Sequence, residues 1–469
     1  MRASALVSKS VLLTVLSLAS WVQPGGVSAD PTLTTLHNFT GSDGAQPTGR
    51  LIFDQSGALY GTTDIGGAAG SIVNGGCASV SVCGSNGNID GYSPLAGLIP
   101  DASGTLYGTA SAGPGSGYGT VFKLTPPSAT GGVWTIDVLH SFTLGDGGQP
   151  YVGSLIFDNS GALYGTTNVG GLGGAANRGV VFKLTPPGTT GDSWTEVVLH
   201  SFGDTGCADG SQPLSGVTFD ASGALYGTTV GGGSLGCDIN VGTVFKLTPP
   251  AMPGGAWTES VLHRFTDNEG VNPPAGVIFD NFGALYGTTQ AGANGYGTIF
   301  KLTPPSTTGG VWTINVLHSF TQNEGYPSYG NLVFDESGAL YGATIFGGTF
   351  GYGTIFKLTP PSATGGIWSL SVLHSFTGND GAIPYDGLIL DKSGTLYGTT
   401  NQGGAYGYGT VFKLATGMTF VGTPGQANCY GQSVSALARQ YGGLDAAAAA
   451  LGYSSAAVLQ NAITAYCAG

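Results

Sequence analysis

The sequence has few charged residues, and basic ones are particularly scarce. Charged residues make up 8% of the 469, and 13 lysines and arginines stand against 26 aspartates and glutamates, which gives a formal net charge of -13. A chain this acidic is not expected to bind nucleic acid or an anionic membrane surface. The 86 glycines follow no strict third-residue repeat, so a collagen helix is excluded as well.

Long apolar runs and metal-binding motifs are also missing. After the first thirty residues no apolar stretch is long enough to span a membrane, so no transmembrane segment is expected once a leader is removed. No CxxC pair occurs and the histidines lie elsewhere, which argues against zinc. No GK[ST] follows glycine-rich segments such as residues 170–174, which we interpret as hairpin loops. The sequence therefore predicts no cofactor and no metal.

The N-terminus has the features of an export signal spanning residues 1–29. Arg2 and Lys9 give a positive start, a short apolar run covers residues 11–22, and residues 27–29 fit a small-residue cleavage site. An uncleaved anchor is the alternative. We expect a secreted, periplasmic or cell-surface protein.

Six cysteines agree with an oxidising compartment. Six cysteines allow fifteen pairings, and the locality of these favours one of them. That pairing joins Cys77 to Cys83, Cys207 to Cys237, and Cys429 to Cys467.

One unit of four strand-like segments recurs along the chain. In residues 330–376 the segments read GNLVFD, ALYGAT, GTIFKLTP and WSLSVLHSF, and we call them A to D. The A–B link, Asp-x-Ser-Gly, is typical of a tight hairpin in which Asp bonds to its own turn and Gly takes a positive φ. Segment D alternates, which predicts Val316 on the packed face and Leu317 on the other. The tyrosine of segment B marks seven copies, at Tyr60, Tyr107, Tyr164, Tyr226, Tyr286, Tyr341 and Tyr397.

Seven units of this length predict an all-β fold, a seven-bladed β-propeller of four-stranded blades over residues 30–415. The chain begins with a lone D segment, residues 33–39, and its last unit ends with a C segment, residues 409–414. We expect the N-terminal segment to complete the last blade and close the ring. A β-helix is the rival fold. Because the first unit lacks the VFKL segment and tryptophan, six blades with an added hairpin is a further alternative.

The composition changes after the repeats. Residues 416–428 are interpreted as a linker, and the alanine-rich residues 429–469 as a small α-helical module tied by Cys429 and Cys467. Its predicted roles are protein docking, surface retention or a cap on the propeller.

The unit LIFDxSGALYGTT…GTVFKLTPP…WTxxVLHSF resembles the GloVer tandem repeat of bacterial exported proteins. The resemblance covers residues 32–415 and rests on long strings that recur. Members of that family share the repeat and carry differing C-terminal sorting or anchoring segments. The resemblance implies export from a bacterial cell and is compatible with surface attachment. It implies no established activity and no catalytic residue.

The links between segments fall on two faces of the predicted disc. The A–B and C–D links form one face and barely vary among the copies, and we call it the hairpin face. The B–C and D–A links form the other, the loop face, and they vary in length and content, as residues 170–178 and 292–296 illustrate. Binding residues tend to lie on variable loops held by a rigid scaffold. The loop face is therefore the candidate binding surface.

An acidic residue followed by glycine and then proline recurs once per unit on the loop face. Carboxylates are hard oxygen donors, so a ring of them could bind cations or hydrogen-bond sugar hydroxyls. The alternative is that the acid shapes a turn before strand A. Separate blades would hold these groups too far apart to share one ion unless they converge on the channel. The acids are Asp43, Asp90, Asp146, Asp209, Glu269, Glu324 and Asp380.

The other repeated polar and aromatic residues are predicted to be structural. The histidine of Val-Leu-His lies on the packed D segment, the lysine of Phe-Lys-Leu pairs with strand-end carboxylates, and the tryptophan packs between blades. Catalysis needs unlike groups that converge once, and no such cluster is evident, so no catalytic residue is predicted.

These observations predict an exported, non-enzymatic repeat scaffold that binds a glycan or a protein through the loop face. A carboxylate-dependent hydrolase or lyase acting on polysaccharide is one alternative. A purely structural cell-surface component is another. The sequence leaves the ligand and the oligomeric state open.

Overall fold

The computed structural model describes residues 31–467, apart from short gaps. Its described residues belong to two compact units, Pro31–Thr416 and Gly417–Gly469. The expected signal (1–29), most of the expected linker, Cys83, Asp90 and Cys237 lie outside the described residues. In the described part, no helix is long and apolar enough to cross a membrane. The gaps are 67–76, 81–90, 92, 114–116, 130–131, 172–177, 190–191, 204–205, 234–240, 253, 293–294, 308, 362, 364, 417–427, 442 and 451–454.

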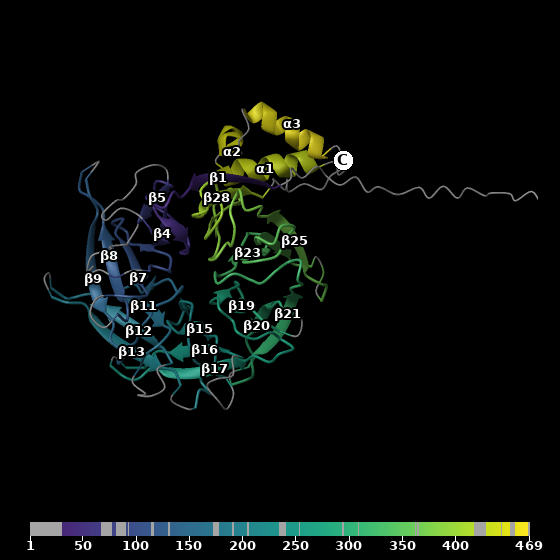
Figure 1. Cartoon of the computed structure of the whole chain (residues 1–469). Helices are drawn as coiled ribbons and strands as arrows, with labels where there is room; N and C mark the ends of the chain where they lie inside the picture. Colours follow the sequence, from purple (N-terminus) through teal and green to yellow (C-terminus); the bar gives the residue numbers. More distant parts are fainter. Residues whose placement is uncertain are drawn as a thin grey trace, which may run out of the picture. The chain divides into compact units, whose positions relative to one another are not determined.

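The unit Pro31–Thr416 is a seven-bladed β-propeller of four-stranded sheets, as the repeat predicted (Figure 1). We number the blades 1 to 7 in chain order of their A strands. Blades 2 to 6 each hold four consecutive antiparallel strands in the order A-B-C-D. These strands are β6 (Ile99–Pro100), β7 (Leu106–Ala110), β8 (Thr120–Thr125) and β9 (Thr135–Ser141); β10 (Ile156–Phe157), β11 (Leu163–Thr167), β12 (Val180–Thr185) and β13 (Thr195–Ser201); β14 (Thr218–Phe219), β15 (Leu225–Thr229), β16 (Thr243–Thr248) and β17 (Thr258–Arg264); β18 (Ile278–Phe279), β19 (Leu285–Thr289), β20 (Thr298–Thr303) and β21 (Thr313–Ser319); β22 (Val333–Phe334), β23 (Leu340–Thr344), β24 (Thr354–Thr359) and β25 (Ser369–Ser375).

The N-terminal strand closes the ring, which confirms the predicted exchange. Blade 7 takes β26 (Ile389–Leu390), β27 (Thr395–Thr400) and β28 (Thr410–Ala415) from the end of the repeats. Its fourth strand is β1 (Thr32–Asn38), antiparallel to β28, and Leu33 pairs with Leu414. The closure covers the backbone edge that β28 would otherwise leave open to pairing with other chains.

Blade 1 departs from the all-antiparallel pattern that the repeat predicts. Its strands β3 (Ile52–Phe53) and β4 (Leu59–Ile65) form the usual A–B hairpin, and β2 (Ala45–Pro47) pairs with the end of β4. The next strand, β5 (Cys77–Val80), runs parallel to β4. No GTVFKLTP segment returns the chain here, and a parallel strand requires a crossover in place of a hairpin.

The core lies between neighbouring blades. In each of blades 2 to 5 the tyrosine of strand B meets the tryptophan of the next blade, as Tyr164 and Trp257 do with ring centroids 6.3 Å apart. The phenylalanine of strand C is fully buried, and Phe182 contacts Phe142 of the preceding blade. The predicted inter-blade packing of tryptophan is confirmed. Burial of each such aromatic side chain contributes roughly 2–3 kcal/mol, so the stack of blades supplies most of the stability.

The predicted alternation of the D strands is wrong in their second half. In β21, Ile299 of β20 pairs with His318 and Phe300 with Val316, so one residue bulges out. Val316 is therefore exposed, and Leu317 packs against the core of blades 5 and 6. A bulge inserts one extra residue and reverses the faces of the side chains that follow it, which an alternation pattern cannot anticipate.

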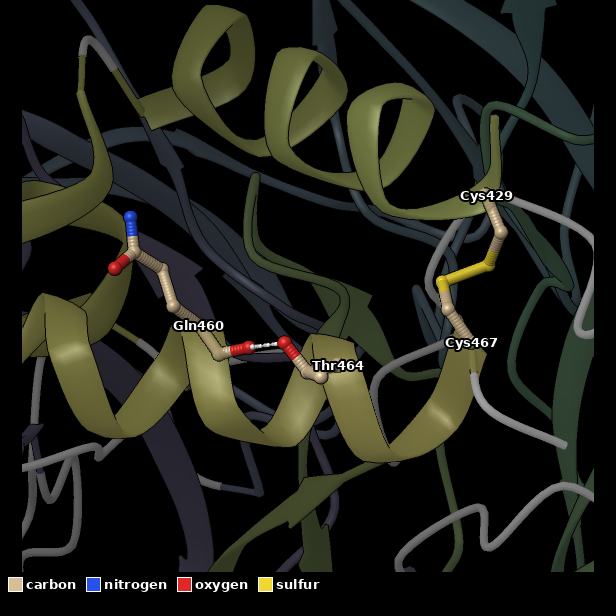
Figure 2. The surroundings of a disulfide bond; sticks show 4 residues. All are labelled: Cys429, Gln460, Thr464 and Cys467. Atoms are coloured by element: carbon tan, nitrogen blue, oxygen red, sulfur yellow. Dashed lines mark hydrogen bonds between the residues drawn. A yellow bond between two sulfur atoms is a disulfide. The ribbon is translucent and has the colours of Figure 1, made fainter. Parts of the chain in front are cut away.

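The residues 429–467 form the predicted helical module. It contains α1 (Cys429–Tyr441), α2 (Leu444–Ala450) and α3 (Ala456–Cys467), packed around Leu437, Leu459 and Ile463. The predicted disulfide joins Cys429 to Cys467, with Cα atoms 5.6 Å apart (Figure 2). Cys207 is also disulfide-bonded.

Candidate functional site

On the hairpin face, the aspartate that begins an A–B link accepts hydrogen bonds from that same link. Asp158 Oδ1 accepts hydrogen bonds from the Ser160 and Ala162 amides at 2.8 and 3.0 Å, and its Oδ2 accepts one from the Tyr164 hydroxyl at 3.0 Å. Although burial opposes the change, hydrogen bonds from Ser160 and Ala162 lower the pKa of Asp158. Lys183 Nζ lies 3.4 Å from the same carboxylate, as predicted for the repeated lysines. The same arrangement recurs at Asp220, Asp280 and Asp335.

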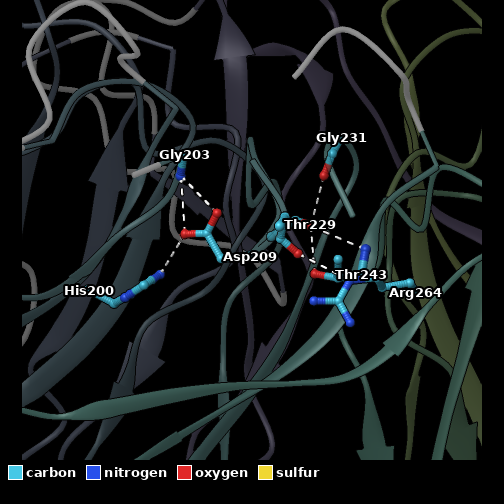
Figure 3. A network of polar contacts seen from close by, with 8 residues as sticks. His200, Gly203, Asp209, Thr229, Gly231, Thr243 and Arg264 are labelled. Carbon is cyan, nitrogen blue, oxygen red and sulfur yellow. Dashed lines mark hydrogen bonds and ion pairs between the residues drawn. The ribbon is translucent and has the colours of Figure 1, made fainter. Parts of the chain in front are cut away.

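On the loop face, each described acid of the predicted ring pairs with the histidine of Val-Leu-His. At one of these pairs, His374 Nε2 lies 2.9 Å from Asp380 Oδ2, and Oδ1 accepts the Thr377 amide at 2.8 Å. Figure 3 shows a second pair, in which Asp209 accepts from His200 and from the Gly203 amide. The carboxylate therefore joins the end of strand D to the turn that follows it. The remaining pairs are His37–Asp43, His140–Asp146, His263–Glu269 and His318–Glu324.

The acids of the predicted ring keep part of their surface open to solvent. Side-chain exposure lies between 20% and 27% for five of the six described acids, and Asp209 is 8% exposed. Asp90 lies outside the described residues. Each described acid thus has a local structural role of the kind that the turn alternative anticipates. A binding role for these carboxylates stays a prediction.

The backbone of the loop face is held in an uncommon conformation that repeats around the ring. Gln149, which precedes Pro150, has a φ of 52°, in the left-handed region where side chains are seldom found. Its amide donates to the Tyr118 carbonyl of the preceding blade at 2.7 Å. Such a conformation persists only where the surroundings fix it, so the hydrogen bond holds this D–A link to the neighbouring blade. The same φ region is used at Gln46, Ser93, Gln212, Asn272 and Ile383.

Exposed aromatic side chains gather on the B–C links of blades 6 and 7. Phe350 is 57% exposed and Tyr406 62% exposed, and the two residues occupy equivalent positions, 56 residues apart. Tyr352 and Tyr408 form a second equivalent pair, and Phe346 is exposed beside them. The expectation of a variable loop face did not name these residues. Comparison of the B–C links by composition could have found them.

A cluster of unlike groups meets at the centre of the ring, where the sequence predicted none. Tyr151 and Tyr385, from blades 3 and 7, bring their hydroxyls within 3.2 Å, and Tyr329 stacks on Tyr385 with ring centroids 4.7 Å apart. Neighbouring D–A links also touch, because a Cβ on Gly330 would overlap the backbone of Gly387. Aromatic rings from blades 3, 6 and 7 therefore meet at the inner ends of the D–A links.

Beside the tyrosines lies a buried carboxylate. Asp386 is 8% exposed; its Oδ1 accepts the Gly387 amide at 2.6 Å, and its Oδ2 has no hydrogen-bond partner among the described residues. Burial raises the pKa of Asp386 to about 6, although Gly387 and the nearby Arg50 oppose the change. Arg50 stands where four other units have glycine, and this break in the repeat was the signal available from sequence.

Comparison with known proteins supports the repeat and adds no activity. No curated protein matches the chain. A solved structure from Thermus thermophilus, assigned as an oxidoreductase (glucose dehydrogenase), is 20% identical, with a TM-score of 0.39; the match covers 68% of this chain and 95% of that one. A sialidase from Trypanosoma rangeli is 10% identical, with a TM-score of 0.33; the match covers 82% of this chain and 58% of that one. At these values the likenesses carry no argument about chemistry.

The sequence itself gives a definite assignment. Residues 26–171, 129–314 and 307–444 match the family described as the Gloeobacter/Verrucomicrobia repeat. Together the three regions span the whole propeller, in agreement with the resemblance carried by the repeated segments. The chain belongs to the Gloeobacter/Verrucomicrobia repeat family.

Proposed function

We propose that this protein is an exported, non-enzymatic scaffold that binds a neutral glycan through the aromatic side chains of its loop face in blades 6 and 7. The observation that carries the proposal is the exposure of Phe350 and Tyr406 at equivalent positions of adjacent blades. Exposed aromatic side chains that gather on adjacent loops are typical of a binding surface.

The loops that carry these rings are held in place by backbone hydrogen bonds. Gly348 donates to the Asn323 carbonyl at 2.6 Å, and Gly404 donates to the Gly378 carbonyl at 2.9 Å. The Tyr352 ring lies over Gly378 of the next blade, where an added Cβ would be 3.3 Å from it. Because the backbone of these loops is held in place, a ligand loses little affinity to the ordering of the loops.

The chemistry of the surface favours a glycan. An aromatic face stacks well against the apolar CH face of a sugar ring, and the scarcity of basic groups in the chain disfavours an anionic ligand. Two equivalent aromatic pairs on adjacent blades suit a polymer that can contact both, and two linked contacts bind more tightly than one.

A carboxylate-dependent hydrolase or lyase gains no comparable support. Such an enzyme needs a pair of carboxylates whose oxygens can reach the substrate. In the described ring acids, histidine and turn amides already hydrogen-bond to the carboxylate oxygens, as at Asp380.

Export is supported by the disulfide between Cys429 and Cys467, which is typical of oxidising compartments.

The test is binding of the intact, fluorescently labelled protein to an array of neutral polysaccharides and oligosaccharides. We expect saturable binding to a subset of glycans, and a loss of at least tenfold in affinity in the double variant Phe350→Ala/Tyr406→Ala. Phe282→Ala is the matched control, because Phe282 is 90% exposed on an A–B hairpin of the opposite face. Its affinity should equal that of the parent protein.

Two results would contradict the proposal. The first is the absence of saturable binding to every glycan on the array, which would favour a structural component or a protein ligand. The second is glycan binding that the double variant retains in full.

A further inference from the structure

The second residue of strand D differs between blades in a way that changes its chemistry. It is apolar at Ile136, Ile314 and Leu370, where the side chain packs between blades. In blade 3 the same position is Glu196, in β13, and in blade 4 it is Glu259, in β17. A carboxylate at an apolar packing position loses hydration and needs a partner.

Glu196 meets the acid–histidine pair of the preceding blade. His140 at the end of β9, Asp146 in the following link and Glu196 each offer one donor atom, and these atoms all lie within 4.8 Å of one another. All three residues are half-buried. One imidazole nitrogen and one carboxylate oxygen from blade 2 and its following link therefore lie close to one carboxylate oxygen from blade 3.

The donor atoms of this set are incompletely satisfied. Nε2 of His140 lies 3.2 Å from Asp146 but is not aligned to hydrogen-bond with it, whereas the other five described histidines hydrogen-bond to their acids. Oε1 of Glu196 is also buried, with no hydrogen-bond partner among the described residues. A buried polar atom of this kind calls for a partner such as a water molecule or an ion. Oε1 of Glu259 in blade 4 likewise has no hydrogen-bond partner among the described residues, but there the histidine, His200, is hydrogen-bonded to Asp209.

Burial acts against the charge of both groups that meet between the blades. It lowers the pKa of His140, although Asp146 opposes the change. Burial, with the nearby Asp146 carboxylate second, raises the pKa of Glu196 to about 7. The two carboxyl groups lie close together, with no cation hydrogen-bonded to either in the described part of the chain.

We propose that His140, Asp146 and Glu196 bind one divalent transition-metal ion between blades 2 and 3. One imidazole and two carboxylates are a common ligand set for ions such as Zn²⁺ and Mn²⁺, and water would complete the coordination. The sequence predicted no metal, because His140 and Asp146 belong to a repeated structural pair and Glu196 lies fifty residues further along the chain. A metal at this place would tie two blades together at their outer edge.

The test uses the full chain, with any affinity tag removed and stray metal stripped by EDTA and dialysis. Calorimetric titration with ZnCl₂ should show one ion bound per chain, and the thermal midpoint should rise when Zn²⁺ is added. Glu196→Gln should weaken Zn²⁺ binding at least tenfold. Ca²⁺ should bind at least tenfold more weakly than Zn²⁺, because it prefers oxygen to imidazole nitrogen.

Two further variants separate metal binding from folding. Glu196→Ile installs the apolar residue type of blades 2, 5 and 6, so the variant should fold and lose Zn²⁺ binding. Glu259→Gln is the matched control at the next blade interface, where His200 is hydrogen-bonded to Asp209, and it should leave the Zn²⁺ affinity unchanged. The proposal is overturned if no stoichiometric Zn²⁺ binds, if both Glu196 variants bind as the parent does, or if Ca²⁺ binds as tightly as Zn²⁺.

Discussion

On both the hairpin face and the loop face, an acidic residue fixes a turn in each blade. The residues around these turns are nearly constant on the hairpin face and differ between blades on the loop face. On the hairpin face, Asp158 and its equivalents fold nearly identical turns, and the side chains around them hardly change from blade to blade. On the loop face, Asp380 and its equivalents also fix turns, but the residues beyond them differ between blades. The aromatic pair at Phe350 and Tyr406 is one such difference. Within the strands, Glu196 and Glu259 depart from the apolar residues that other blades have at the same position.

This difference indicates where to look for function in a repeat protein. A residue that recurs in every copy is first of all part of the fold, since each blade needs it to close its own turns. A residue that departs from the repeat is free of that requirement. In this chain the departures are Glu196, Arg50 and the exposed aromatic rings, and each lies where a ligand, an ion or a neighbouring blade can meet it.

The largest effect on stability is expected from a substitution that removes the carboxylate from a turn of the hairpin face. Asp158→Ala removes the acceptor for the Ser160 and Ala162 amides and the Tyr164 hydroxyl, and it leaves Lys183 without its carboxylate. We expect the free energy of unfolding to fall by about 2–3 kcal/mol, measured by urea denaturation. Asn159→Ala, in the same turn, is the control. A loss equal to that of the control would show that the turn does not depend on the carboxylate.

The next largest effect on stability is expected from Asp386 at the centre of the ring, and it depends on pH. The pKa of Asp386 is about 6 in the folded protein, above the ordinary value of 3.8, so the folded state binds more protons between these values. Stability from this group is therefore highest at low pH and falls as the pH rises toward 6. Asp386→Asn keeps an acceptor for the Gly387 amide and should raise the unfolding free energy at pH 8 by on the order of 2 kcal/mol.

That gain should largely disappear at pH 4, where the carboxyl of Asp386 is already neutral in the folded state. Urea denaturation at the two pH values measures the difference. If Asp386→Asn is less stable than the parent at pH 8, then Arg50 depends on the negative charge and the account of this pair is wrong.

A smaller effect is expected from the acids of the loop face. Asp380→Ala removes a partner of His374 and of the Thr377 amide in a half-exposed turn, so we expect a loss of about 1 kcal/mol in the free energy of unfolding. His374→Ala should cost a similar amount, and the double variant should cost less than the sum of the two because they share one interaction. Strict additivity would contradict the pairing.

The smallest effect on stability is expected from the exposed aromatic side chains of the loop face, on which glycan binding is expected to depend. Phe350→Ala and Tyr406→Ala remove exposed rings, so each should change the free energy of unfolding by less than about 0.5 kcal/mol. Phe282→Ala on the hairpin face should behave in the same way. A loss above roughly 1 kcal/mol would mean that the aromatic rings of the loop face are part of the core.

The fold followed from the sequence because its signals are local and repeated. Short motifs were enough to predict three features of the fold. These are the turn at Asp158, the ion pair of Lys183 and the placement of the lone D segment beside β28. The bulge before His318 was missed, because a pattern of alternating residues does not reveal an inserted one. The parallel course of β5 was missed, since no segment of that blade resembles its counterparts.

The candidate sites were harder to predict because they depend on contacts between blades. Glu196 reaches His140 only across the interface between blades 2 and 3, and the distance along the chain says nothing of this contact. The contact between Tyr151 and Tyr385 spans the ring, with 234 residues between them. The ring of acids was visible in the sequence because it recurs, and its recurrence reflects the turns that it closes.

The most direct test of the account measures stability and glycan binding together in two variants. Glu269→Ala, in the equivalent turn before blade 5, should lower the free energy of unfolding by about 1 kcal/mol and leave the affinity for the glycan found on the array unchanged. Phe350→Ala/Tyr406→Ala should leave stability unchanged and reduce that affinity at least tenfold. If the carboxylate variant loses the glycan and the aromatic variant keeps it, the repeated acids are the binding residues and the account is contradicted.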